Sequence, residues 1–429
     1  MKKQTVRKVG EQARVVGPIV APLIAQLVLP MVEAIASTKQ GLLEFVHRMG
    51  MSALDEVLGV EAARIAGPKG KHDGARQFNH WGHAPAELTL GGRRVQVKRP
   101  RVRAVVGGDV ALPSFERLSE SDPLPERVLK QILLGVSTRG YAESLEPVPV
   151  SLKSRGTSKS AAGRHLVERT RAKTAEFLSR RLDDVAITAM FVDGLELAGH
   201  TVVLALGVTV DGTKVPLGLA LGSTENAPLC TSLLQKLLDR GLKIEHPILA
   251  TIDGGKGIRK ALTDVLGDRV FVQRCQEHKK RNVLDHVPDS RKPYVRRQLR
   301  DAYQSDTTRT ARRRLKQLVS WLDRNGEPDA AASLREGLEE TLTVHKLGLP
   351  KTLRRTFSTT NPIENMNGTV RRVSRNVKRW RDGTMARRWV AFAVLAAQAK
   401  FRRIKGHRDM PALVTALSRS LAVDAEEAA

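Results

Sequence analysis

The sequence is poor in the residues that would place it in several common protein classes. Its 429 residues include two cysteines, Cys230 and Cys275, which cannot build a disulfide framework. Aromatic residues make up 4% of the chain, so stacking platforms for single-stranded nucleic acid are poorly supplied. The most membrane-like stretch, residues 19–32, is too short to span a bilayer and is interrupted by prolines, so we expect a buried helical segment there. With no signal-peptide pattern after Met1, we expect no membrane partner and a reducing, cytoplasmic location.

Acidic residues are scarce relative to basic ones. Lys and Arg number 72 against 45 Asp and Glu, which gives a formal net charge of +27. Because basic residues recur from Lys2 to Arg408, an extended polyanion fits better than one small anion. With so few aromatic residues, contact with the backbone of a duplex is favoured, and double-stranded DNA is predicted ahead of an anionic membrane surface.

The N-terminal part reads as mostly α-helical with one small β hairpin. Residues 1–70 are predicted as a helical unit, and residues 67–83 as a loop rich in Gly and His. Residues 71–120 are a small β-containing basic segment, in which an alternating pattern turns at Gly91 and Gly92.

Residues 121–183 return to helical spacing. Ser158 or Ser160 is placed to cap a second helix, and this helix carries Lys159, Arg164 and Arg169. The pattern suits a helix-turn-helix that binds DNA. An ordinary helical linker with a solvated basic face is the alternative.

Residues 184–288 alternate between strands and helices. Strands are predicted at residues 186–193, 201–210, 214–221, 247–253 and 269–272, with helices at 227–240 and 257–266. This order matches the ribonuclease-H-like fold, an α/β core with a mixed five-stranded sheet. A right-handed crossover then lays the fourth strand beside the first. The acids that end these two strands, Asp193 and Asp253, are expected to be neighbours.

A third acid follows a long charged stretch. Residues 289–350 are predicted as a helical insertion, residues 351–405 as the final helices of the core, and residues 406–429 as a C-terminal tail. Glu364 opens a helix in which Asn361 is the expected N-cap, and such a cap alone would account for an acid there. The basic residues that follow at helical spacing favour phosphate contact as well: Arg371, Arg372, Arg375 and Arg379.

Three separated carboxylates in a basic chain suit two-metal cutting of a phosphodiester, because carboxylates hold the ions while Arg and Lys hold the polyanion. Cys275 and His278 form a Cys-x-x-His pair, but a structural zinc site needs four ligands and no second pair stands nearby. The pattern therefore argues against zinc.

Four segments together resemble, in order, the signatures of mutator-type transposases of bacterial insertion sequences. They are Phe191-Val-Asp-Gly194, Ile252-Asp-Gly-Gly-Lys-Gly257, Gln273-Arg-Cys-x-x-His-Lys-x-Arg-Asn282, and Thr359-Thr-Asn-Pro-Ile-Glu364 followed by Arg371-Arg372. The resemblance covers roughly residues 40 to 405.

This resemblance implies an Asp-Asp-Glu recombinase with Asp193, Asp253 and Glu364 as catalytic residues and ligands of two Mg²⁺ or Mn²⁺ ions. His278 would assist strand positioning near the active site. The residues expected to contact DNA are Lys159, Arg164, Arg169, Lys279, Arg281, Arg371, Arg372, Arg375 and Arg379. The implied partners are terminal inverted repeats and target DNA, bound by a homodimer or higher homo-oligomer associated with the bacterial nucleoid.

The sequence therefore predicts a DNA transposase that cleaves element ends and joins them to a target. Two alternatives stay open. A catalytically silent, element-derived regulator would keep the basic surface, and a structure-selective nuclease on the same fold would cut branched DNA without joining strands.

Overall fold

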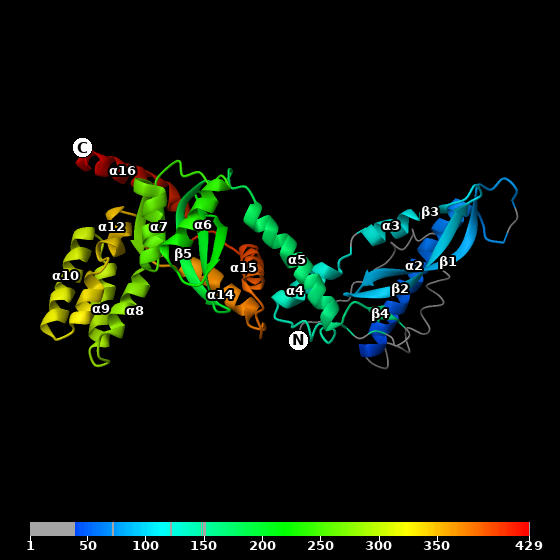
Figure 1. Ribbon diagram of the computed structural model, residues 1–429, viewed down its shortest axis with the longest axis horizontal. Helices are drawn as coiled ribbons and strands as arrows, with labels where there is room; N and C mark the ends of the chain where they lie inside the picture. Colours follow the sequence, from blue (N-terminus) through cyan, green and yellow to red (C-terminus); the bar gives the residue numbers. More distant parts are fainter. Residues whose placement is uncertain (1–38, 71–72, 121, 147, 149–151, 429) are drawn as a thin grey trace, which may run out of the picture. The chain divides into compact units, whose positions relative to one another are not determined.

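The structure, a computed structural model, describes residues 39–70, 73–120, 122–146, 148 and 152–428 (Figure 1). These residues belong to two units, one made of Met1–Gln131 with Val136–Leu166 and the other of Ile132–Gly135 with Val167–Ala429. The division falls inside helix α5 (Lys159–Ser179), earlier than the domain limit predicted at residue 183. The helical segment predicted at residues 19–32 lies outside the described residues.

The first unit is built on a small antiparallel sheet. Strands β1 (Phe78–Leu90) and β2 (Arg93–Ala104) form a hairpin around Gly91 and Gly92, whose φ angles of 60° and 83° lie in the left-handed region that glycine tolerates. The short strands β3 (Asp109–Val110) and β4 (Ser154–Arg155) both pair with β2.

Helix α2 (Lys39–Ala66) packs on this sheet through a core that includes Leu58, Ala62, Val97 and Val102. The hairpin is longer than predicted, because cross-strand pairing continues back to Phe78. As a result, His80 and His83 lie in a strand instead of the predicted loop.

Helix α3 (Pro113–Glu120) ends just before residues 121–183, where a helix-turn-helix was predicted. Two helices lie within that stretch, α4 (Leu124–Leu133) and α5. Ser158 caps α5, because its Oγ accepts a hydrogen bond of 3.2 Å from the Ala161 amide. Residues 134–158, including β4, separate α4 from α5. This layout differs from the turn of three or four residues that joins the helices of a helix-turn-helix.

A five-stranded mixed sheet organises the second unit, as predicted. Its strands are β5 (Ile187–Leu197), β6 (His200–Thr209), β7 (Lys214–Gly222), β8 (Ile248–Ile252) and β9 (Val270–Arg274), and their order is β7-β6-β5-β8-β9. The first three strands form an antiparallel meander, whereas β8 pairs in parallel with both β5 and β9. The crossover thus lays the fourth predicted strand beside the first.

The two faces of this sheet have different partners. Met190 and Val192 of β5 enter a core shared with helices α6 (Ala227–Asp239) and α7 (Lys256–Leu266). Because side chains alternate along a strand, Phe191 and Asp193 face the other way. There the ring of Phe191 stacks on that of Phe357, with centroids 5.8 Å apart. Asp193 therefore faces the C-terminal helices.

Those helices are α13 (Lys351–Phe357), α14 (Asn361–Ser374) and α15 (Gly383–Gln398). Helix α14 lies against β5 although the two are far apart in the sequence, as the orange and green ribbons in Figure 1 show. Residues 406–429, predicted as a tail, instead contain a 3-10 turn, η3 (His407–Asp409), and helix α16 (Met410–Ala428). Met410, Leu413 and Leu417 of this helix are buried, so it is part of the packed unit.

Helices alone fill the predicted insertion. The 3-10 turn η1 (Gly267–Arg269) precedes β9, and helix α8 (Gln276–Asp285) follows it. The insertion itself contains α9 (Lys292–Tyr303), α10 (Thr308–Arg324), α11 (Pro328–Arg335), η2 (Glu339–Leu342) and α12 (Thr343–Lys346). They enclose a core of their own that includes Val295, Leu299, Leu315, Leu322 and Leu334. Among the described helices, none combines the length and the apolar character needed to cross a bilayer.

Candidate active site

Parallel pairing of β5 with β8 brings two acids side by side. Val192 is paired with Ile252, so the next residues along the two strands are Asp193 and Asp253. Asp253 follows the last residue of its strand, as predicted. Asp193 does not end a strand, because β6 continues to pair with β5 as far as Leu197. The prediction that Asp193 closes its strand is therefore wrong, although the predicted juxtaposition is present.

Asp193 is held by an amide from helix α14. The Nδ2 atom of Asn367 donates a hydrogen bond of 2.7 Å to Asp193 Oδ2. Both side chains are buried, with 8% of Asp193 and 1% of Asn367 exposed. Burial and then the nearby Asp253 carboxylate raise the pKa of Asp193 to about 6, against the lowering influence of His278 and of the Asn367 hydrogen bond. Burial thus disfavours the charged form of Asp193, and a bound cation would stabilise that form.

Sequence reasoning missed Asn367. Its spacing from Glu364 is one helical turn, which places both side chains on the same side of α14, and this spacing is the signal that could have found it. The Oδ1 atom of Asn367 is buried without a hydrogen-bond partner among the described residues. An unsatisfied amide oxygen beside a carboxylate is able to accept from a metal-bound water or to bind a cation.

Glu364 lies in the first turn of α14, where Thr360 organises its surroundings. Thr360, not the predicted Asn361, occupies the N-cap position. Its hydroxyl donates a hydrogen bond of 2.6 Å to Glu364 Oε1. The same hydroxyl oxygen lies 3.3 Å from His278 Nδ1 and 3.4 Å from Cys275 Sγ. Thr360 therefore joins the Cys-x-x-His pair to the third acid.

Cys275, His278 and Glu364 place their donor atoms within 4.8 Å of one another. The hydrogen bond with Cys275 raises the pKa of His278. Burial raises the pKa of Cys275, but its hydrogen bonds with His278 and Thr360 outweigh burial and lower it. His278 Nδ1 lies 3.9 Å from Glu364 Oε1, which is an ion-pair distance when the imidazole is protonated.

A fourth carboxylate, Glu225, was also missed. A Cβ atom built on Gly194 or on Gly255 would fall onto the Glu225 carboxylate, so these two glycines leave the space that it fills. Burial, Asp253 and then Asp193 raise the pKa of Glu225 to about 7. From the sequence, Glu225 reads as part of the cap of α6, whose N-cap is Asn226. The glycines beside both catalytic candidates were the available signal.

The basic residues predicted on α14 and beyond it are exposed. Arg371 and Arg372 lie in the last turn of α14, which ends at Ser374. Arg375 and Arg379 therefore follow the helix instead of continuing a helical stripe, and the predicted stripe is broken. Arg281 on α8 is exposed.

Lys279, predicted to contact DNA, lies inside the protein. Its side chain is fully buried, and Nζ donates to the carbonyl oxygens of Ser333 at 2.6 Å and Glu336 at 2.7 Å. Burial lowers the pKa of Lys279 to about 8. Its donors are used inside the protein, where they tie α8 to the end of α11, so the prediction that Lys279 contacts DNA is wrong.

Comparison of the sequence with known proteins identifies its family. Residues 25–403 match the family model described as "Transposase, Mutator family". The transposase of insertion sequence element IS256 in transposon Tn4001 from Staphylococcus aureus is 24% identical over 332 residues, which cover 75% of this chain and 81% of the relative.

Two further relatives agree with this match. The transposase of ISRM5 from Rhizobium meliloti is 26% identical over 347 residues, covering 79% of this chain and 83% of the relative. The transposase of IS905 from Lactococcus lactis is 26% identical over 289 residues, covering 65% and 69%. The resemblance noted in the sequence is confirmed: this chain belongs to the Mutator family of transposases.

Proposed function

We propose that this chain binds the terminal inverted repeats of an insertion sequence and catalyses metal-dependent DNA cleavage and strand transfer with Asp193, Asp253 and Glu364. The observation that carries the proposal is the convergence of these acids from three elements. Register places the first two together, and the Asn367–Asp193 hydrogen bond draws in the helix that carries the third. Relatives named as insertion sequence transposases support the same class of reaction.

The sheet order supports a ribonuclease-H-like core. An antiparallel meander whose first strand pairs in parallel with a fourth is the arrangement expected of that fold, and here it extends to β9. The helical insertion lies between the second and third acids, where the family resemblance places it.

The donor set fits hard divalent cations. Carboxylate oxygens are the ligands that Mg²⁺ and Mn²⁺ prefer, and the unsatisfied Asn367 Oδ1 lies beside Asp193. Asp193, Asp253 and Glu364 would hold two such ions, which supply activation of the attacking water or 3′-hydroxyl and charge stabilisation at the leaving oxygen. The three acids do not form a group within 4.8 Å, and ligands shared between two ions about 4 Å apart need not do so.

The chain's own residues prepare this chemistry. Asn367 fixes the Asp193 carboxylate, and Thr360 fixes Glu364. His278, held by Cys275 and Thr360, lies beside the third acid, and we assign it to positioning a DNA strand there. We assign phosphate contacts to Lys159, Arg164, Arg169, Arg281, Arg371, Arg372, Arg375 and Arg379, and we expect the protein to act on DNA as a homodimer or larger homo-oligomer.

Alanine substitution at each acid tests the proposal. We expect Asp193→Ala, Asp253→Ala and Glu364→Ala to abolish Mg²⁺-dependent cleavage and strand transfer on a labelled repeat end, while a gel-shift assay shows end binding largely intact. Asp211→Ala, which removes an acid from the β6–β7 turn, is the matched control and should cut normally.

The alternatives predict other results. Wild-type protein that binds ends but never cuts would be a regulator, and cutting of branched DNA without repeat preference would mark a structure-selective nuclease. Normal turnover by any one alanine variant would remove that residue from the site.

A further inference from the structure

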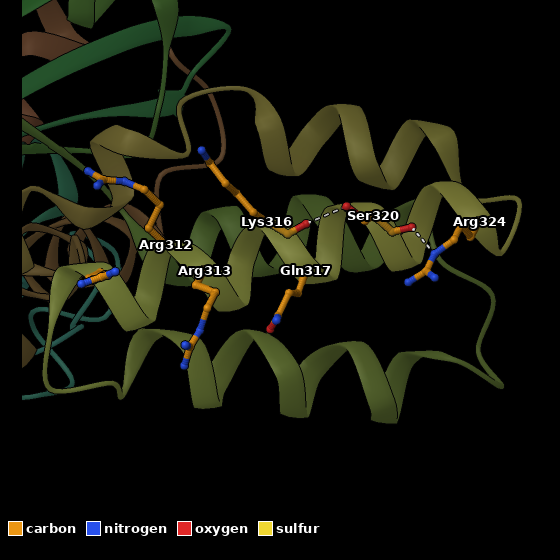
Figure 2. A pocket seen from close by; sticks show the side chains of 7 residues that line it. Arg312, Arg313, Lys316, Gln317, Ser320 and Arg324 are labelled. Atoms are coloured by element: carbon orange, nitrogen blue, oxygen red, sulfur yellow. Dashed lines mark hydrogen bonds between the residues drawn. The ribbon is translucent and has the colours of Figure 1, made fainter.

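The insertion presents a strongly basic helix face that the site described above does not use. Helix α10 carries six cations and one acid, and five of those cations line a shallow surface depression of about 450 Å³ together with Gln317 and Ser320 (Figure 2). The lining cations are Arg309, Arg312, Arg313, Lys316 and Arg324.

Some of these charges are already satisfied within the protein. Arg312 forms a two-point ion pair with Glu339, with both N–O distances at 2.8 Å. Arg324 Nε donates to the Ser320 carbonyl at 3.1 Å, and the one acid of the helix, Asp323, pairs with Arg335. Arg314, which does not line the depression, donates to the Asp301 carbonyl at 2.7 Å.

Three cations are left over. Within the described part of the chain, the side chains of Arg309, Arg313 and Lys316 make no ion pair or hydrogen bond, and all three residues are exposed. They follow one another at intervals of four and three residues, which places them on one side of the helix. Figure 2 shows Arg313 and Gln317 extending from the same side of α10. Neighbouring unpaired cations repel one another, and binding of a polyanion reduces this repulsion.

The opposite side of α10 prevents the helix from turning this face away. Ala311, Leu315, Leu318 and Leu322 are buried in the insertion core. The basic face is therefore held rigidly outward. Arg309 to Lys316 spans about 10 Å at 1.5 Å per residue, which equals the rise along the duplex axis of about three phosphates of one strand.

We propose that this surface, Arg309, Arg313 and Lys316 on α10, binds the sugar-phosphate backbone of duplex DNA without reading its sequence. Long flexible cations and a small polar lining suit phosphate oxygens, and no stacking aromatic lines the depression to favour a single strand. The proposal rests on the proposed function in that it takes the polyanion to be DNA. The duplex is either the element end beyond the cleavage point or the target.

The test uses the full-length triple variant Arg309→Gln/Arg313→Gln/Lys316→Gln. Each lost phosphate contact reduces the slope of log K against log salt by about 0.9, so the slope should become shallower by about 2.7. The variant Arg309→Lys/Arg313→Lys should keep the wild-type slope, because a backbone contact needs charge and not the guanidinium fork. Circular dichroism and thermal melting check that each variant is folded.

A charge-count control removes three exposed lysines that lie outside the insertion: Lys236→Gln/Lys243→Gln/Lys260→Gln. Equal weakening by this control would mean a general charge effect and overturn the proposal, as would an unchanged slope in the α10 variant. Two duplexes identify the source. If the salt slope changes only with repeat ends that extend past the cleavage point, the surface binds the DNA flanking the cleavage site. If the slope also changes with an unrelated duplex, the surface binds target DNA.

The proposed function can fail separately. Wild-type protein that binds duplex with a steep salt slope but does not cut would overturn the catalytic proposal alone. Wild-type cutting combined with an unchanged slope in the α10 variant would overturn this inference alone.

Discussion

Replacing Asp193 by asparagine should stabilise the metal-free protein at neutral pH while abolishing cleavage. Burial raises the pKa of Asp193 to about 6, whereas an Asp in an unfolded chain titrates near 3.9. The folded state therefore holds this proton more tightly than the unfolded state. The free energy of unfolding is highest for this group below the unfolded pKa, and it falls as pH rises toward the folded pKa.

The size of the effect follows from the shift. About two pKa units at 1.36 kcal/mol each give a cost of about 3 kcal/mol at pH 7.5. Asparagine is nearly isosteric, and its Oδ1 can still accept from Asn367 Nδ2. Because the new amide N–H group must find its own partner, we expect a gain between about 1 and 3 kcal/mol, falling to about 1 kcal/mol or less at pH 4.5.

The free energy of unfolding at pH 7.5 and pH 4.5 is measured by urea unfolding in the presence of EDTA, followed by tryptophan fluorescence. Trp321, Trp380 and Trp389 lie in the second unit and Trp81 in the first, so most of the signal reports on the unit that holds Asp193. A destabilised variant at pH 7.5, or a gain of equal size at both pH values, would refute the reasoning that burial of the charge is the cause.

A control of opposite sign is available in the β6–β7 turn. Hydrogen bonds from the Thr209 and Thr213 hydroxyls lower the pKa of Asp211 to about 2. Its stabilisation is present above the unfolded pKa and is lost as pH falls toward 2. Asp211→Asn should therefore destabilise the protein at neutral pH, and less so in acid.

Two further substitutions address the surroundings of the acids. Asn367→Ala removes a hydrogen bond that lowers the pKa of Asp193, so the acidic limb of the cleavage–pH profile should move to higher pH, with a loss of about 10- to 100-fold at pH 7; an unmoved limb would contradict this role. Gly255→Ala places a Cβ onto the Glu225 carboxylate and should weaken Mn²⁺ binding measured by electron paramagnetic resonance, whereas Gly163→Ala, with nothing within 4 Å, should leave it unchanged.

The sheet was predictable because local pattern decides it. Buried apolar runs with turn residues between them mark β5 to β9, and the handedness of the crossover places β8 beside β5. The length of β5 was not predictable in the same way. Its extension past Asp193 depends on pairing with β6, a property of two strands together.

Side-chain contacts between distant segments were harder to predict. The spacing of Asn367 from Glu364 indicates which side of α14 it occupies, but its partner Asp193 lies 174 positions away in the sequence. Lys279 looked like a surface cation because lysine usually is one, and carbonyls at the end of α11 make its burial possible. Thr360, Glu225 and Lys279 all acquire their roles from partners that pattern alone does not name.

The late position of α14 has a consequence for protein synthesis. Glu364 and Asn367 leave the ribosome after the sheet and the whole insertion, and domains generally fold as they emerge. A nascent or truncated product that ends before α14 lacks the third acid and the amide that holds Asp193, yet it contains the first unit and β5 to β9. If the proposed function holds, the last segments translated complete the active site, and we expect a fragment released early to bind DNA without cutting it.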